Sequence, residues 1–204
     1  MPARKQSPAS TQDDAYAHRL AALQQVWWKR ILPVQAPYRW NLRRLDLGFT
    51  LDLGCGIGRN LDHLRGNGVG IDHNQEAVAI ARAGGFAAFT PAEFLSSPYA
   101  RPKRFDALLL APVAEHMDDA AVVELLRAHV GFLRPGAKVV IITPQERGYR
   151  SDPSHVQFMD FTALESIAAA TGLEVGRTFS FPFPRWTGSL FVYNEFVLVS
   201  TLPH

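Results

Sequence analysis

Cysteine and long apolar runs are scarce in this sequence. Cys55 is its single cysteine, which excludes an internal disulfide and a cysteine metal cluster. No apolar run approaches the roughly 20 residues that a membrane-spanning helix needs. Residues 1–12 hold Pro, Ser, Gln and Lys without the apolar stretch of a signal peptide. We therefore expect a cytoplasmic protein with a disordered start over residues 1–12.

Excess charge is also scarce, with a net charge of +2 at pH 7. Lys and Arg gather within residues 1–50, but aromatic side chains do not interleave with them as on a surface that stacks bases. Nucleic acid is therefore disfavoured as a partner. The 204 residues, 47% of them hydrophobic, suffice for one domain with one core. We expect that domain over residues 13–204, with residues 13–48 as a helical extension that covers the site.

A glycine-rich turn is the clearest feature that the sequence does have. Residues 49–53 form a short apolar run that predicts a buried strand, and Gly54, Gly56 and Gly58 follow it. Glycines at these places allow positive φ and keep Cβ atoms out of the turn, so a flat ligand can pack against main chain. The helix predicted over residues 59–64 points its free N–H groups at the same place.

The spacing of these glycines separates two kinds of cofactor site. The dinucleotide fingerprint G-x-G-x-x-G requires a third glycine at position 59, which is Arg59. The run from Asp52 to Gly58, Asp-x-Gly-x-Gly-x-Gly, instead resembles motif I of the class I S-adenosylmethionine-dependent methyltransferases. A tight turn that binds no ligand is the alternative for this motif taken alone.

Further motifs follow in the order of that family. Residues 68–72 form a second apolar run that ends in Asp72, where this architecture places a carboxylate on the ribose hydroxyls. The alternative role for Asp72 is that of a helix N-cap. Asn74 is better placed for that role, because it directly precedes a helix predicted over residues 75–83. The resemblance also implies cofactor contacts from Asp52, Cys55, His73 and Ala111.

The predicted adenine contacts follow a third strand over residues 86–89. Relatives often carry an acid and a backbone amide there for the adenine amino group and ring nitrogen. Pro91 stands where an Asp is common, which leaves the Ala92 amide and Glu93. Before the first strand, an aromatic or an Arg meets the methionine carboxylate in many relatives, and Tyr38 and Arg39 are the candidates here.

The remaining strands define the fold. Strands over residues 105–110 and 138–143 flank a helix over residues 119–132 and a Leu-Arg-Pro-Gly turn typical of the family. Residues 173–181 and 189–201 read as strands with no helix between them, which predicts antiparallel neighbours. We therefore expect a Rossmann-like α/β fold with a seven-stranded sheet, order 3-2-1-4-5-7-6, an antiparallel last strand and helices on both faces.

Two histidines lie in loops predicted at the carboxyl edge of this sheet. His116, in a Glu-His loop, and His155 are candidates for a general base or for orienting the acceptor, although His116 can equally cap or pack. The ubiquinone-type O-methyltransferases have a similar loop in which a further Glu, three residues before the Glu-His pair, helps to hold a divalent metal. Pro112 stands at that position here, so we expect no metal.

The long polar loop over residues 144–160 predicts a cover for the substrate. We expect Glu115, Tyr149, Arg150 and Asn194 to line the substrate pocket, although surface packing is an equal alternative for the residues of the loop and of the last strand. An arginine there hints at an anionic acceptor.

The resemblance implies an S-adenosylmethionine-dependent methyltransferase that acts on a small molecule. A methyltransferase for RNA or protein is the second reading, a dinucleotide-dependent oxidoreductase a distant third, and a scaffold that only binds the cofactor a further alternative. The asparagine-proline motif of many N-methyltransferases that act on nucleic acid or protein is absent after the fourth strand. The sequence indicates neither the methyl acceptor nor the oligomeric state.

Overall fold

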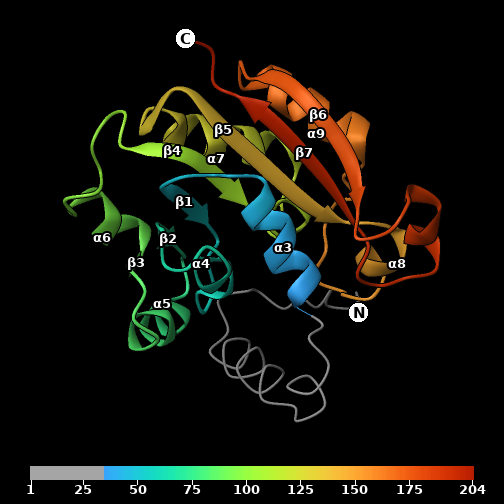
Figure 1. Ribbon diagram of the computed structural model, residues 1–204, viewed down its shortest axis with the longest axis horizontal. Helices are drawn as coiled ribbons and strands as arrows, with labels where there is room; N and C mark the ends of the chain where they lie inside the picture. The colour runs from blue at the N-terminus through green and yellow to red at the C-terminus, as the bar shows by residue number, and fades with distance from the viewer. Residues whose placement is uncertain (1–34) are drawn as a thin grey trace, which may run out of the picture.

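The computed structural model describes residues 35–204. The expectations for residues 1–12, and for residues 13–34 of the extension, lie outside the described residues. Element labels follow Figure 1. The helices are α3 (Ala36–Arg44), α4 (Arg59–His63), α5 (Gln75–Ala83), α6 (Pro91–Leu95), α7 (Asp119–Val130), α8 (Glu146–Tyr149) and α9 (Phe161–Ala170), with the 3-10 helices η1 (Ala114–His116) and η2 (Arg185–Ser189). The strands are β1 (Thr50–Leu53), β2 (Gly68–Ile71), β3 (Ala88–Phe89), β4 (Phe105–Leu110), β5 (Leu133–Pro144), β6 (Glu174–Phe181) and β7 (Glu195–Thr201).

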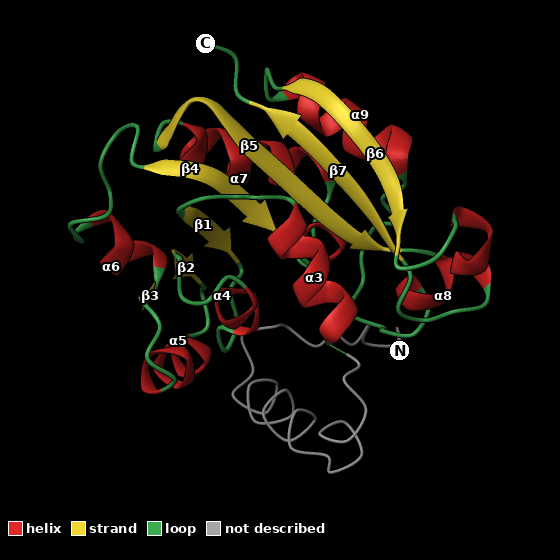
Figure 2. Cartoon of the chain, in the orientation of Figure 1, coloured by secondary structure: helices red, strands yellow, loops and turns green. Residues whose placement is uncertain are grey.

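The strands form one seven-stranded sheet in the order β3-β2-β1-β4-β5-β7-β6 (Figure 2). β1 pairs in parallel with β2 and β4, and β4 pairs in parallel with β5. β7 lies antiparallel between β5 and β6. The predicted fold class, strand order and reversed last strand are confirmed.

Helices cover both faces of the sheet (Figure 1). On one face α6, α7 and α9 pack over a buried cluster that includes Leu126 and the β4 residue Leu108. On the other face Leu42 of α3 packs in a second cluster with Leu109, the next residue of β4. This alternation along β4 is the period of an extended strand, and it makes the strand apolar throughout because neither face meets water.

Three segments differ from their predicted boundaries. Residues 133–136, predicted as a turn, begin β5, and a bulge between β4 and β5 accommodates them. The loop predicted over residues 144–160 contains α8. β7 begins at Glu195 and not at residue 189, and η2 lies in a connection that we predicted to be free of helix. Gly188 of η2 packs so closely on the Gln145 side chain that a Cβ would not fit, which keeps the chain from extending into a strand there.

The strands β1, β2, β3, β4 and β6 and the helices α4, α5 and α7 agree with their predicted bounds within two residues at each end, whereas α3, α6 and η1 had no predicted bounds of their own. Among residues 35–204, no helix combines the length and the apolar character that crossing a membrane requires.

Asn194 holds the connection between β6 and β7 in place. Its side chain is fully buried, and its amide donates to Gln145 Oε1 and to Ser180 Oγ, both at 2.9 Å. Its Oδ1 accepts from the Phe183 amide at 2.9 Å. We expected Asn194 in the substrate pocket, but the side chain lies behind the pocket wall. The neighbouring residues Val192, Tyr193 and Glu195 line the cavity instead.

Asn194→Ala should lower the free energy of unfolding by about 2 kcal/mol or more, because it leaves the buried Gln145 Oε1 and the Phe183 amide without their hydrogen bonds. Urea denaturation measures this change. Asn67→Ala is the matched control, because the Asn67 amide donates to Gly48 O in an exposed position. Equal losses for the two variants would contradict a structural role for the Asn194 network.

Candidate active site

The candidate site lies where β1, β4 and β5 end, the edge at which open α/β sheets bind ligands. A partly open cavity of about 260 Å³ is lined there by α3, α4, η1, the segment after α8 and the segment before β7. Its wall combines segments that are far apart in the sequence. The polar side chains on the wall belong to Gln35, Tyr38, Asn41, Arg59, Asn60, His63, Glu115, Ser151, Asp152, His155, Tyr193 and Glu195.

The chain leaves β1 through a left-handed turn. Gly54, Gly56 and Gly58 have φ angles of 72°, 52° and 87°, a region that glycine enters without steric cost. The Gly54 and Cys55 amides donate to the Ile71 carbonyl at 2.7 and 3.1 Å, which fixes the turn to the end of β2. The Cys55 side chain is buried in a core cluster with residues of α4 and α5, so a cofactor contact from Cys55 can come only from its backbone.

Asp72 borders this turn. Its Oδ2 accepts from the Gly56 amide at 2.8 Å, and its Oδ1 accepts from the Asn74 amide at 2.9 Å. Asn74 is the N-cap of α5, as predicted, because its side chain accepts from the Ala77 amide at 3.0 Å. The Asp72 carboxylate therefore lies at the glycine turn, where we predict the ribose. The next side chain, His73, is 47% exposed.

Asn60 links three parts of the site. Its amide donates to Asp52 Oδ1 at 3.3 Å and to the Ala111 carbonyl at 2.9 Å, so it ties the ends of β1 and β4 to α4. Asp52 is fully buried, and burial raises its pKa to about 7. The sequence reasoning placed Asp52 and Ala111 here but missed Asn60. Its position in the first helical turn after the last glycine was the available signal.

α3 closes one side of the cavity. The Tyr38 hydroxyl donates to the Tyr193 carbonyl at 2.5 Å, which ties α3 to the segment before β7. Burial raises the pKa of Tyr38. Arg39 is exposed and does not line the cavity, whereas Arg59, the first residue of α4, does. The sequence reasoning missed Arg59 as a wall residue, and a cofactor contact from Arg39 stays a prediction.

The cavity wall carries groups of both charges. Arg59 lies there with His63, whose pKa is lowered to about 4 by burial and then by the nearby Arg59. Glu115 and Glu195 also line the cavity, and burial raises the pKa of each carboxyl to about 8, although Arg59 opposes the rise at Glu195. Both acids are therefore largely protonated at neutral pH unless a cationic group joins them. Glu195 is a wall residue that we did not predict individually.

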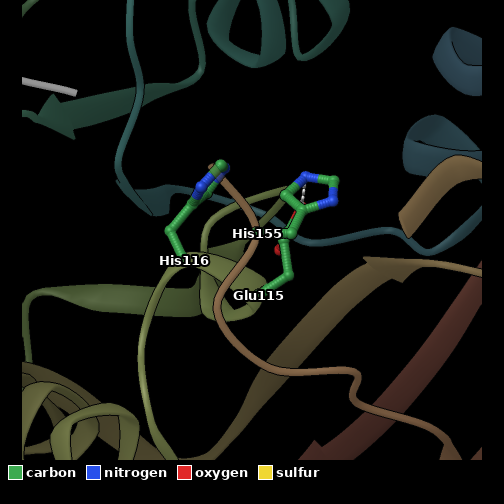
Figure 3. A group of neighbouring side chains, drawn as sticks. All are labelled: Glu115, His116 and His155. Carbon is green, nitrogen blue, oxygen red and sulfur yellow. Dashed lines mark ion pairs between the residues drawn. The ribbon is translucent and has the colours of Figure 1, made fainter. Parts of the chain in front are cut away.

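The two predicted catalytic histidines lie together beside Glu115 (Figure 3). The ring centroids of His116 and His155 are 4.9 Å apart, and His155 Nε2 lies 3.9 Å from Glu115 Oε1. The chain after α8 causes this arrangement, since the amides of Val156 and Gln157 donate to the Glu115 carbonyl at 2.8 and 3.2 Å. Burial lowers the pKa of His116. His155 and Glu115 line the cavity, and His116 lies beside them.

The predicted substrate residues of the 144–160 segment do not reach the cavity wall. The Tyr149 ring stacks on the His155 ring, with centroids 5.4 Å apart and an interplanar angle of 21°. Tyr149 therefore supports His155 from behind. Arg150 is exposed, and the wall is formed by Gly148, Ser151 and Asp152.

The predicted adenine contacts lie in α6. The Glu93 carboxylate accepts from the Thr90 amide and hydroxyl at 2.8 and 2.9 Å and pairs with Arg82 at 2.8 Å. Arg82, and then Thr90, lower the pKa of Glu93 to about 2. The structure thus gives this carboxylate a role at the start of α6. An adenine contact from Ala92 or Glu93 stays a prediction.

Comparison with known proteins identifies the class. Residues 42–177 match the model of a protein family described as a methyltransferase domain. This chain therefore belongs to the methyltransferase domain family. A search of the curated proteins found no significant match.

Solved structures share the fold at low sequence identity. A SAM-dependent methyltransferase from Archaeoglobus fulgidus has a TM-score of 0.63 and 19% identity, over 80% of this chain and 92% of that one. A chain in the complex between the Haloferax volcanii Trm112 methyltransferase activator and a methyltransferase has a TM-score of 0.70 and 20% identity, over 96% and 98%. A TehB-like SAM-dependent methyltransferase from Corynebacterium glutamicum has a TM-score of 0.63 and 17% identity, over 94% and 100%.

S-adenosylmethionine is the cofactor of this methyltransferase, and the glycine turn fits it. A Cβ built on Gly56 would meet nothing within 4 Å, so the turn presents open space beside bare main chain. The Asp72 carboxylate lies at one end of the turn and the cavity at the other. We predict that the ribose binds at Asp72 and that the methionine end of the cofactor points toward the cavity.

Gly56→Ala should weaken the binding of S-adenosylhomocysteine about tenfold or more, because its methyl group projects into that open space. Isothermal titration calorimetry measures the affinity. Gly172→Ala is the matched control, since Gly172 has φ of 79° and also faces open space. Both variants carry the left-handed strain of about 1–2 kcal/mol, but only Gly56→Ala should lose affinity; an unchanged affinity would remove the turn from the cofactor site.

Asp52→Asn should stabilise the protein increasingly as the pH rises. The pKa of Asp52 in the folded protein, about 7, exceeds its ordinary value of about 4, so the unfolded chain releases the proton first and wild-type stability falls between these pH values. Asp52→Asn has no carboxyl group to titrate at this position, so its free energy of unfolding does not fall in this way. Its advantage should grow by up to about 1.4 kcal/mol per pH unit in this window.

Urea denaturation at several pH values across this window tests the Asp52 prediction. Asp62→Asn is the matched control, because Asp62 is an exposed acid of α4. The prediction is contradicted if the free energy of unfolding differs between Asp52→Asn and the wild type by the same amount at every pH.

Proposed function

We propose that this methyltransferase transfers the methyl group to a small-molecule acceptor that enters the cavity between the glycine turn and the Glu115–His155 pair. The observation that carries the proposal is the small volume of this partly open cavity. The cavity measures about 260 Å³, near the lower end of ordinary ligand pockets. The Tyr38 hydrogen bond to Tyr193 closes α3 against the segment before β7. An acceptor of metabolite size fits such a space better than a folded macromolecule does.

Methyl transfer requires little covalent chemistry from the protein. S-adenosylmethionine, when bound, supplies a methyl group on a sulfonium, which is already an activated leaving group. The chain's own residues must align the acceptor atom with the methyl–sulfur bond and exclude water. The buried end of the cavity, with Asp52, Asn60 and Ala111 behind it, supports that exclusion.

We infer the orientation of the cofactor from the charged groups of the cavity wall. Arg59 suits the carboxylate of the methionine end, and it lies in α4 directly after the glycine turn. His155 and Glu115 lie on the acceptor side, because they come from the loops after β5 and β4. We infer that His155, with Glu115 beside it, positions the reacting atom of the acceptor.

Transfer of an isotope-labelled methyl group tests this proposal. The protein is incubated with labelled S-adenosylmethionine and a cell extract divided into metabolite, RNA and protein fractions. Label should appear in the metabolite fraction, and Asp72→Asn, which removes a charge from the glycine turn, should abolish the signal. Label confined to RNA or protein would overturn the small-molecule acceptor and favour a macromolecular one.

A further inference from the structure

Glu115, His116 and His155 form a cluster of ligand atoms that the sequence did not predict. Each residue offers one nitrogen or oxygen, and these atoms lie within 4.8 Å of one another. Figure 3 shows the two imidazoles and the carboxylate gathered from two separate loops. An ion at their centre needs each ligand atom to move by less than about 1 Å to reach the usual zinc distance of about 2.1 Å.

Backbone carbonyls fix the protonation of both imidazoles. His155 Nδ1 lies 2.7 Å from the Tyr149 carbonyl, and His116 Nδ1 lies 3.2 Å from the Ser154 carbonyl. A carbonyl can only accept, so each Nδ1 carries a hydrogen, and in the neutral ring the Nε2 lone pair is then the one available to a metal. Histidines that bind metals are held in this way by a second hydrogen bond. The Tyr149 ring, stacked on His155, further restricts that side chain.

Glu115 provides the independent sign of a missing ligand. The residue is 1% exposed, and its Oε2 has no hydrogen-bond partner among residues 35–204. A buried carboxylate oxygen without a partner is costly. Its other oxygen lies 3.9 Å from His155 Nε2, which is too far for a hydrogen bond. A cation between the carboxylate and the imidazoles satisfies all three groups at once.

We propose that Glu115, His116 and His155 bind a divalent transition-metal ion, with Zn²⁺ as the first candidate. Two imidazoles and one carboxylate form a donor set of catalytic zinc sites, which keep a further position open. Pro112 led the sequence reasoning to exclude a metal, because it stands in place of a second glutamate. In the structure His155, from another loop, supplies the third ligand.

The metal would act on the acceptor, and this part of the inference rests on the proposed function. Glu115 and His155 line the cavity, so the open position faces the acceptor. There the ion lowers the pKa of a hydroxyl or thiol. The acceptor gives its proton to solvent, its freed electron pair bonds to the methyl carbon, and the methyl–sulfur pair stays on the departing thioether. The inferred acceptor class is therefore a small alcohol, phenol or thiol.

Metal binding is tested without acceptor or S-adenosylmethionine, which separates it from the proposed function. Untagged full-length protein is stripped with EDTA and titrated with Zn²⁺ by calorimetry. One ion per chain should bind, and His155→Gln and Glu115→Gln should each weaken binding about 100-fold or more. The surface variant His204→Gln should bind as the wild type does. Co²⁺ should give visible absorption bands that both site variants lose.

Each outcome either supports the metal site or overturns it. Circular dichroism shows whether each variant folds, and Glu115→Gln, nearly identical in shape, remains informative if His155→Gln does not fold. Zn²⁺ binding that the site variants leave unchanged, or no binding by the wild type, would overturn the metal site. Methyl transfer that persists in stripped protein with no Zn²⁺ binding would overturn it too, while leaving the proposed function intact.

Discussion

The left-handed turn after β1 is the constraint on which the rest of the site depends. A Cβ on Gly54 would lie 2.3 Å from Val113, and one on Gly58 would lie 2.6 Å from Phe86. The turn therefore packs at once against the loop that precedes η1 and against the segment that precedes β3. Because glycine alone tolerates both the conformation and the contacts, Gly54 brings the cofactor turn and the Glu115 loop together, and Gly58 brings the turn against Phe86.

The fold could be predicted from the sequence because its signals are local. Apolar runs of strand length, the Asn74 cap and the missing glycine at Arg59 each depend on a few adjacent residues. Their order along the chain, combined with the resemblance to a known family, predicted the strand order that the structure shows. Asp72 was predicted at the glycine turn for the same reason, since the acid directly follows the apolar run of the second strand.

The cavity wall could not be predicted in the same way, because it depends on how distant loops meet. His155 joins Glu115 only because residues 156 and 157 bond to the Glu115 carbonyl. The prediction put Asn194 in the pocket, but its neighbours Tyr193 and Glu195 line the cavity instead. The sequence does not tell which side of that segment faces inward. Arg150 points to solvent because the short helix α8 ends just before it. Arg59 and Asn60 could not be assigned to the wall from the sequence, because their place there depends on how α4 meets α3 and the end of β4.

We infer that the cofactor lies along the glycine turn with its sulfur directed at the Glu115–His155 side of the cavity. A crystal structure with S-adenosylhomocysteine is the decisive measurement. We expect ribose hydroxyls on Asp72, the methionine end beside Arg59, and the sulfur facing His155 across empty space. A sulfur directed away from His155, or a ribose that does not touch Asp72, would contradict this inference.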